Sequence, residues 1–163
     1  MNTLTKIREL DPEGRHSLCV HMLDWFEYHG HVCIAFELLG MSVYDFLKKN
    51  RFAPYPLDDI REILYQLSQA VDFLHQSKIV HTDLKPENIL FVDSSWVEWY
   101  NPQRRKHQRR VKRADIRVID FGSATGENDH HSTVVVTRHY RPPEVILEVT
   151  IGFDSQLTCN FGD

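Results

Sequence analysis

Residues 81–88 read HTDLKPEN, and the tripeptide DFG follows at residues 120–122. In phosphoryl-transfer sites, a stretch like the first places an aspartate beside the acceptor hydroxyl and an asparagine beside a metal ion. The second motif supplies an aspartate for the metal that bridges the nucleotide phosphates. The two motifs stand in the order that such a site requires, and together they are far more specific than either alone. They predict a site for phosphoryl transfer.

Four side chains of these motifs have expected roles. We expect Asp83 to orient the acceptor hydroxyl and Lys85 to neutralise charge on the transferred phosphoryl group. Asn88 and Asp120 are the expected metal ligands. The alternative is a surface loop with ordinary charges. It is disfavoured because Asp120 directly follows an apolar, strand-like run at residues 116–119, where a metal-binding aspartate is required.

Proline and glycine are expected to shape the two loops. Pro86 fixes its own φ and disfavours a helical Lys85, so the catalytic loop should stay extended. Gly122 is expected to supply the backbone freedom by which the chain turns away after the second motif. Phe121 is expected to pack against the core rather than to contact a ligand.

The composition is that of one globular domain. A chain of 163 residues with 42% hydrophobic residues can bury a core, which argues against general disorder. The net charge of −4 gives no overall case for nucleic-acid partners, so direct nucleic-acid binding is not expected. No stretch reaches the roughly 18–20 apolar residues of a membrane span, and the first residues lack the apolar region of a signal peptide. A membrane partner is therefore not expected.

Hydrophobic periodicity and turn residues predict the order hairpin, hinge, helices, catalytic loop, strand and long loop. This order indicates an α+β fold with a mainly helical lower part. The expected elements are a hairpin of strands at 18–28 and 31–38 around a turn at 29–30, a helix at 42–50 capped by Ser42, a helix at 58–77, short strands at 79–80, 89–91 and 116–119, and an ordered loop from 122 to 143.

The segment 58–77 carries the strongest helix signal. Asp58 or Asp59 is the expected N-cap, and Glu62 in the first turn favours the same start. Apolar residues recur at helical spacing and predict one buried stripe beneath the catalytic loop. Its members are Ile60, Ile63, Leu64, Leu67, Val71 and Leu74.

The Phe-Glu-Leu-Leu-Gly run that joins the hairpin to the helical part is a candidate nucleotide-binding hinge. The exposed backbone at Glu37 and Leu38 is expected to hydrogen-bond an adenine edge. We expect Phe36, Leu90 and Ile119 to form apolar walls for a flat ring, with Phe36 limiting the depth. Taken without the catalytic loop, the same run would be interpreted as a buried strand end.

Residues 137–144, after the long loop, resemble the end of the activation segment of a protein kinase domain, and this resemblance implies that they shape the acceptor site. We expect Thr137 to hydrogen-bond Asp83 and Lys85, with Arg138 beside it in the substrate loop. Glu144 is expected to pair with an arginine further along such a domain. The alternative is a surface loop that ends at two prolines.

Residues 92–114 form a polar and basic insertion, which is expected to be a solvated or mobile loop. A phosphate- or RNA-binding patch is the alternative, because aromatic side chains for stacking lie nearby. The cations are Arg104, Arg105, Lys106, Arg109, Arg110, Lys112 and Arg113, and the aromatic residues are Trp96, Trp99 and Tyr100. No metal site is expected at residues 130–131, two histidines without a partner at helical spacing.

The motifs closely resemble those of the LAMMER (CDC-like, Clk) dual-specificity kinases. The resemblance runs from about Leu18 to Leu147, with its centre in residues 81–91, 120–125, 130–133 and 137–141. It implies a bilobal protein-kinase-like fold, ATP and Mg²⁺, and phosphorylation of Ser and Thr with autophosphorylation on Tyr. It also implies Arg/Ser-rich splicing factors as substrates and residence in the nucleus, with the cytoplasm as an additional location.

Under this resemblance, residues 1–163 form a partial kinase domain. No glycine-rich loop or Val-Ala-Ile-Lys-like strand precedes residue 18, and residues 3–10 match only the tail of the regulatory helix. The bilobal fold is therefore expected to be incomplete, as in a gene-model fragment or a truncated product. The expected parts are an N-lobe hairpin and hinge at 18–40, the first part of a helical C-lobe at 41–147 with the insertion at 92–114 and the activation segment at 120–144, and a divergent tail at 148–163.

Two other functions compete with that of a working kinase. One is a catalytically inactive kinase fragment that acts as a binding module. It is favoured for the isolated chain because the loss of one charge-stabilising donor costs roughly 100–1000-fold in rate. The other is an RNA-binding or adaptor protein built on the basic insertion. We expect little or no kinase activity from the chain by itself.

Overall fold

The structure is a computed structural model that describes residues 2–102, 104–126 and 136–141. The helices are α1 (Asn2–Leu10), α2 (Val43–Lys49) and α3 (Leu57–Gln76), with 3₁₀ turns η1 (Pro86–Asn88) and η2 (Arg138–Tyr140). In the described residues the strands form antiparallel pairs: β1 (Met22–Tyr28) with β2 (His31–Phe36), β3 (Ile79–Val80) with β8 (Thr125–Gly126), β4 (Ile89–Phe91) with β7 (Ile116–Val118), and β5 (Trp96–Asn101) with β6 (Lys106–Val111).

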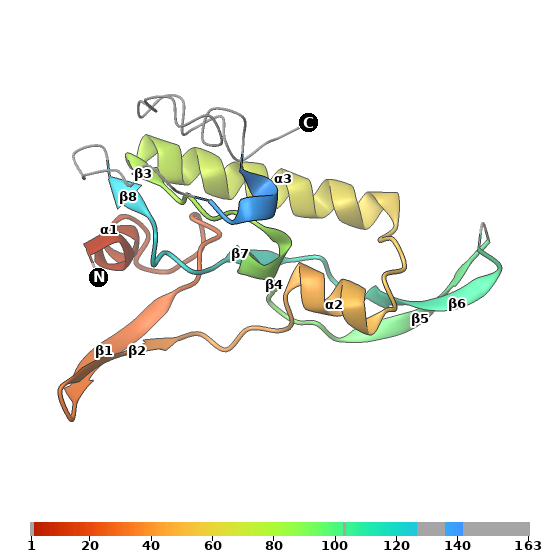
Figure 1. Cartoon of the computed structure of the whole chain (residues 1–163), viewed down its shortest axis with the longest axis horizontal. Coiled ribbons are helices and arrows are strands. Elements are labelled where there is room, and N and C mark those ends of the chain that lie inside the picture. Colours follow the sequence, from red (N-terminus) through yellow and green to blue (C-terminus); the bar gives the residue numbers. More distant parts are fainter. Residues whose placement is uncertain (1, 103, 127–135, 142–163) are drawn as a thin grey trace.

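The elements surround a central body along which α3 runs, and the hairpins β1–β2 and β5–β6 extend from its opposite ends (Figure 1). The α+β fold expected from the sequence is confirmed. None of the helices in the described ranges combines the length and the apolar character that crossing a bilayer requires.

The first hairpin begins later than residue 18. Its predicted turn at residues 29–30 is confirmed, with both residues in the left-handed conformation that such a turn requires. The residues just before the hairpin run beside β7 instead. Val118 N–H donates to the carbonyl of Leu18 at 2.9 Å, and Val20 N–H donates to the carbonyl of Val118 at 2.8 Å. The first residues of the apolar run therefore pair with β7 and the later ones with β2, so that β1 starts only at Met22.

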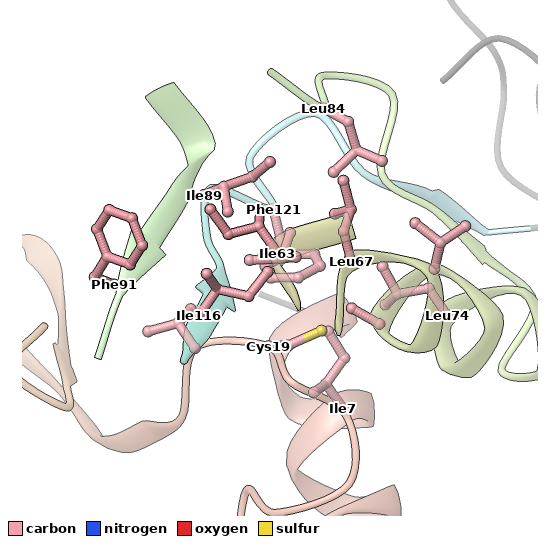
Figure 2. Close-up of a cluster of buried hydrophobic side chains, with 14 of the residues drawn as sticks. Ile7, Cys19, Ile63, Leu67, Leu74, Leu84, Ile89, Phe91, Ile116 and Phe121 are labelled. Carbon is pink, nitrogen blue, oxygen red and sulfur yellow. The ribbon is translucent and has the colours of Figure 1, made fainter. Parts of the chain in front are cut away.

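One apolar core lies between α3, the catalytic loop and the β4–β7 pair (Figure 2). The buried residues of α3 include Ile63, Leu67, Ala70, Val71 and Leu74. The loop and strands contribute Leu84, Ile89, Phe91, Ile116 and Val118. The predicted stripe beneath the catalytic loop is thus confirmed for most members. The prediction that Leu64 is buried is wrong, because this residue lies half-exposed on the outer side of the helix.

The two shorter helices match their predictions. Ser42 caps α2, where its Oγ accepts a hydrogen bond from Asp45 N–H at 2.9 Å. α1 covers the residues expected to be helical and buries Ile7 in the core. The chain after α1 folds around buried Asp11, whose carboxylate accepts from the backbone N–H groups of residues 15–17.

The start of α3 differs from its prediction. The residue before the helix is Pro56, and no side chain caps the first turn, so the prediction of Asp58 or Asp59 as N-cap is wrong. Asp59 lies inside the first turn, where its buried carboxylate receives Nε and Nη2 of Arg110. The Asp59 side chain, which the local sequence pattern assigned to capping, is instead bound by Arg110 from a distant part of the sequence.

The basic insertion is an ordered hairpin, so the prediction of a loop is wrong, although most residues of its two strands are solvent-exposed or partly exposed as expected. β5 and β6 pair residue by residue along their whole length. Asn50 fixes the hairpin to the end of α2, since its Nδ2 donates to the Arg109 carbonyl at 2.8 Å and its Oδ1 accepts from Arg109 N–H at 3.0 Å. These ties cross more than fifty positions of sequence, so the local charge pattern could not reveal them.

Candidate active site

The loop between β3 and η1 holds Asp83 within a network of donors. Lys85 Nζ donates to Oδ2 of Asp83 at 2.6 Å, and Asn88 Nδ2 lies 3.3 Å from the same oxygen. Thr137 donates to Oδ1 through its hydroxyl and, at 3.1 Å, through its N–H. The Thr137 hydroxyl also accepts from Lys85 Nζ at 2.8 Å. The structure thus has the contacts of Thr137 that the sequence predicts.

These contacts set the charges of the pair. Burial acts to raise the pKa of Asp83, but the hydrogen bonds from Lys85 and Thr137 outweigh it and hold that pKa below its usual value. The hydrogen bond to Asp83 raises the pKa of Lys85 in turn. At neutral pH the site therefore contains a carboxylate and an ammonium group in contact.

The catalytic loop is extended at Lys85 but not throughout. Lys85 is extended, with φ −160° and ψ 160°, as Pro86 predicts. The next three residues form the 3₁₀ turn η1, so the prediction of an extended loop is wrong for these residues. The tight turn brings Asn88 back toward the start of the loop, where its Nδ2 donates to the carbonyl of Asp83 at 2.9 Å.

Two polar residues to which the motifs assign no role join this loop to the DFG segment. Buried His81 lies with Nε2 2.9 Å from the carbonyl of Ile119, and its Nδ1 accepts from Asp83 N–H at 3.2 Å. These partners require a neutral ring with the proton on Nε2, and burial lowers the pKa of His81 accordingly. Thr82 Oγ1 donates to the carbonyl of Ser123 at 2.9 Å. The only sequence signal for either residue was its place in the motif.

Asp120 follows β7 in a left-handed backbone conformation, with φ 65°. Asp120 therefore makes the turn, and the prediction that Gly122 supplies it is wrong. Gly122 instead allows the Asp120 side chain to approach its backbone closely. Its N–H donates to Asp120 Oδ1 at 3.3 Å, and an added Cβ would lie 3.2 Å from that oxygen. Phe121 is buried with its ring centroid 5.0 Å from that of His81, as expected for a packing residue.

Asn88 and Asp120 both keep an oxygen for a cation. Asn88 donates through Nδ2, so its Oδ1 has no donor among the described residues. Oδ2 of exposed Asp120 likewise has no donor in that part of the chain. Mg²⁺ prefers such carboxylate and amide oxygens and usually binds with one or two protein ligands, phosphate oxygens and water. No group of three or more His, Cys, Asp or Glu side chains in the described ranges could hold a metal by itself, so the pair fits a cation that arrives with a nucleotide.

The hinge after β2 has few backbone partners. Glu37 N–H donates to the carbonyl of His21 at 3.1 Å, and the Glu37 carboxylate accepts from His21 N–H at 2.9 Å. Leu38 is 97% exposed, and neither its N–H nor its C=O has a partner in the described residues. The alternative of a buried strand end is therefore wrong, and the run is an exposed connection.

The three residues expected to wall a nucleotide pocket come from different elements. Phe36 ends β2 and is partly exposed. Leu90 lies on the face of β4 that points away from the core, opposite Arg117 of β7. Ile119 is partly buried against the core directly before Asp120. Their roles in binding a nucleotide stay predictions.

The substrate loop keeps Thr137 in place through its neighbours. Arg141 Nε donates to the carbonyl of Val136 at 2.9 Å, which closes the short segment around η2. Arg138 is exposed on this segment, and its role toward a substrate stays a prediction. The predictions for Glu144, the histidines at 130–131 and the tail lie outside the described residues.

Glu87 is an acidic group of the site that the sequence predictions did not assign. Its Oε2 is buried and has no hydrogen-bond partner among the described residues. Burial, and then the charge of Glu87, raises the pKa of nearby Tyr140. A buried carboxylate oxygen without a donor costs free energy, which an incoming cation or N–H group would offset.

Comparison with known families identifies the fold and the motifs together. The family described as the protein kinase domain matches residues 4–156. This chain belongs to that family. The kinase chain also matches a crystal structure of a kinase domain with a TM-score of 0.83 and 32% identity, over 98% of this chain and 50% of that one.

Two relatives show which kinases this chain is similar to. It is 59% identical over 149 residues to the serine/threonine-protein kinase Doa of Drosophila melanogaster and 58% identical over 149 residues to the dual specificity protein kinase CLK2 of Homo sapiens. Each alignment takes in 91% of this chain, which spans 18% of Doa and 30% of CLK2. The resemblance to the LAMMER (Clk) kinases is confirmed.

Proposed function

We propose that this chain carries the acceptor-binding and phosphoryl-transfer part of an ATP-dependent protein kinase that acts on Ser, Thr and Tyr hydroxyls. The observation that supports the proposal most is the Asp83 carboxylate. It is held by Lys85, Asn88 and Thr137, and His81 joins it to the segment that carries Asp120. Phosphoryl transfer needs positioning and electrostatic stabilisation above all, and this network provides both.

The chemistry assigns one task to each group. The acceptor hydroxyl oxygen bonds to the γ-phosphorus of ATP, the bond from that phosphorus to the bridging oxygen breaks, and ADP leaves with the electron pair. Asp83 orients the hydroxyl and takes its proton. The Thr137 hydroxyl already donates to Asp83 Oδ1 as an acceptor hydroxyl would, so that oxygen is the proposed proton acceptor. Lys85 stabilises charge on the transferred group.

We propose that backbone groups of the hinge and one metal cation bind the nucleotide. We propose that the free backbone N–H and C=O groups around Leu38 bind the adenine edge, between the apolar side chains of Phe36, Leu90 and Ile119. Asn88 and Asp120 are the proposed ligands of Mg²⁺, which would offset the negative charge of the phosphates. The free oxygens of both side chains support this assignment.

The side chain of Glu87 supports the proposal that the substrates are basic. Its buried and unpaired oxygen beside the acceptor loop would suit a guanidinium group, which forms strong charge-assisted hydrogen bonds with carboxylates. Together with the similarity to LAMMER kinases, this supports Arg/Ser-rich proteins such as splicing factors as the proposed substrates. The same similarity is our reason to propose the nucleus as the location, with the cytoplasm as an additional one.

The second candidate is a kinase-like binding module without catalysis. The feature that favours it is the segment before residue 18, where α1 and the turn around Asp11 stand and where the sequence has neither a glycine-rich loop nor a Val-Ala-Ile-Lys-like strand. In a kinase these two elements cover the phosphates and pair them with a lysine. We therefore expect little phosphoryl transfer from the isolated 163-residue chain.

A chimera separates the two candidates. The part of human CLK2 that aligns with this chain would be replaced by the chain's own residues, and transfer of labelled phosphate from ATP to an Arg/Ser peptide would be measured. We expect clear activity that Asp120→Ala abolishes in the chimera, and little activity from the isolated chain. An inactive but folded chimera that still binds ATP would leave the binding module as the better account. Robust transfer by the isolated chain would show that the segment before residue 18 matters less than proposed.

A further inference from the structure

A cavity of about 360 Å³ lies between the end of α2 and the β5–β6 hairpin, and it shares no residue with the catalytic loop. Cationic side chains from both sides line it. They are Lys49, Arg51, Arg104, Lys106 and Arg109, and the one carboxylate in the lining is Glu98. We propose that this cavity binds the phosphate group of a phosphorylated peptide segment of another protein. Such binding does not require phosphoryl transfer by this chain.

The cations of the cavity are free to meet an anion. Among the described residues, no carboxylate forms an ion pair with any of the five. Neighbouring cations differ, since Arg110 is paired with Asp59 and Arg113 with Asp115. Like charges gathered in one small space repel each other. A phosphate monoester, with a charge of about −1.5 to −2 and three acceptor oxygens, would relieve that repulsion.

The walls of the cavity are held firmly, which favours a preformed site. The reciprocal hydrogen bonds between Asn50 and the backbone of Arg109 join the two sides. Arg110 ties the same strand to α3 through Asp59. On the other side, Arg51 stands in a left-handed turn whose N–H donates to the carbonyl of Lys48 at 3.0 Å. The backbone of both walls is therefore already in place for an anion, while Lys49, Arg51, Arg104 and Lys106 extend exposed side chains from it.

The helix end beside the cavity does not oppose an anion strongly. The C-terminus of a helix carries partial negative charge through its last carbonyls. Here the carbonyls of Phe46, Leu47 and Lys48 accept hydrogen bonds from the N–H groups of the turn at residues 50–52. The carbonyls of α2 are thus engaged, while Lys49 supplies positive charge at the same end.

A peptide phosphate fits the surroundings better than a nucleic acid does. Single-stranded nucleic acid is held by bases stacked on free aromatic rings. The guanidinium of Arg109 lies 4.4 Å from the ring centroid of Trp96 and covers that face. The ring of Tyr100 packs against His107 with centroids 5.4 Å apart. The cavity is also at the small end of ligand sites, as a single phosphorylated side chain requires.

Fluorescence anisotropy with a short labelled phosphoserine peptide tests the proposal on the full chain. The unphosphorylated peptide and a labelled single-stranded RNA serve as the other probes. The test variant is Arg104→Glu/Lys106→Glu, and Lys112→Glu/Arg113→Glu is the matched control, because it reverses one Arg and one Lys of the same insertion outside the cavity. Circular dichroism of both variants reports on folding.

We expect the phosphopeptide to bind more tightly than its unphosphorylated form and to be displaced by inorganic phosphate. The cavity variant should weaken binding more than tenfold, and the control variant by less than about twofold. Equal losses in both variants, or tighter binding of RNA than of phosphopeptide, would overturn the proposal.

A second measurement on the unaltered chain avoids any effect of substitution on folding. Bound phosphopeptide should slow the reaction of Lys49 and Lys106 with an amine-acetylating reagent, read by mass spectrometry, and leave Lys112 unaffected. Lys49 and Lys106 reacting at the same rate with and without the phosphopeptide would overturn the proposal.

Discussion

The two ends of the candidate active site are built differently. At the acceptor end, side chains of the catalytic loop and of the segment around Thr137 hold Asp83. His81 and Thr82 bind the catalytic loop to the DFG segment. At the hinge end, Leu38 lies exposed, and in the part of the chain that the structure describes its backbone N–H and C=O groups have no partner. The acceptor end is thus preorganised by the protein, whereas the hinge end offers groups that only a ligand would engage.

This difference decides which changes should matter. Where side chains carry the function, a substitution removes a specific donor or charge. Where the backbone carries it, most substitutions leave the functional group in place. Catalysis that depends on preorganised charge should therefore be most sensitive at the acceptor end.

The largest expected effect is that of Asp83→Asn in the CLK2 chimera. The amide cannot take the acceptor proton, so kcat should fall roughly 100–10,000-fold. The affinity for ATP should change little, because Asp83 contacts the acceptor side. Steady-state kinetics and nucleotide titration measure the two effects. Leu38→Ala is the control from the hinge end and should leave kcat almost unchanged. A similar loss in both variants would remove the contrast between the two ends.

Leu74→Ala tests the support beneath the acceptor end. Leu74 is 1% exposed in the core that also holds Leu84 of the catalytic loop, so the substitution should lower the free energy of unfolding by about 2–5 kcal/mol. Leu64→Ala is the same change on the exposed side of α3 and should stay within about 0.5 kcal/mol. Urea unfolding of the chain gives both values. Equal effects would mean that the buried face of α3 is assigned wrongly.

Leu38→Pro should separate backbone from side chain at the hinge. Proline removes the N–H group that is proposed to bind adenine, which at about 1 kcal/mol for a hydrogen bond corresponds to a roughly fivefold rise in the KM for ATP. Leu38→Ala keeps the N–H and should leave KM close to its starting value. The comparison is made in the chimera, with kcat as a check on folding. A larger effect of alanine than of proline would show that the side chain, not the backbone, holds the nucleotide.

The same contrast explains how far the sequence could predict the site. Asp83, Lys85 and Asn88 could be predicted because phosphoryl transfer needs these side chains at a set spacing. Thr137 could be predicted because residues 137–144 resemble the end of a kinase activation segment. The tasks of His81 and Thr82 could not, since their partners are backbone carbonyls far along the chain. The proposed hinge contacts use backbone N–H and C=O groups, which nearly every residue has. The spacing of residue types in the sequence therefore cannot identify which backbone groups bind the nucleotide.

For the fold, the insertion at residues 92–114 shows most clearly what the sequence could not predict. Its charge pattern predicted a mobile loop, whereas long-range ties order it as a hairpin. Asp59 was likewise predicted as a cap from its place in the chain, although Arg110 is its partner. In both cases a buried long-range contact prevailed over a local preference. Helices and strands whose apolar pattern matched the core, such as α3 and β4, were predicted well.

The smallest expected effect is a pH dependence that starts from His81. Its neutral ring lies with Nε2 against the Ile119 carbonyl and accepts the N–H of Asp83 through Nδ1, so a second proton would place two donors against each other. The charges of Asp83 and Asp120 favour protonation and that of Lys85 opposes it, but burial is the largest influence and lowers the pKa of His81. Because the folded pKa lies below the unfolded value, the stabilisation is complete above about pH 6.5 and declines as the pH falls toward the folded pKa.

His81→Gln isolates this contribution, because glutamine does not titrate and the other histidines are shared by both proteins. Between about pH 7.5 and 6.0 the unaltered chain should lose up to about 0.8 kcal/mol more unfolding free energy than the variant. Urea unfolding at the two pH values gives the difference of slopes, in which any constant cost of the substitution cancels. Parallel slopes would show that His81 does not hold the acceptor end in its neutral form. A steeper slope for the unaltered chain would extend the contrast with the hinge, where no titrating group among the described residues bonds to the backbone of Leu38.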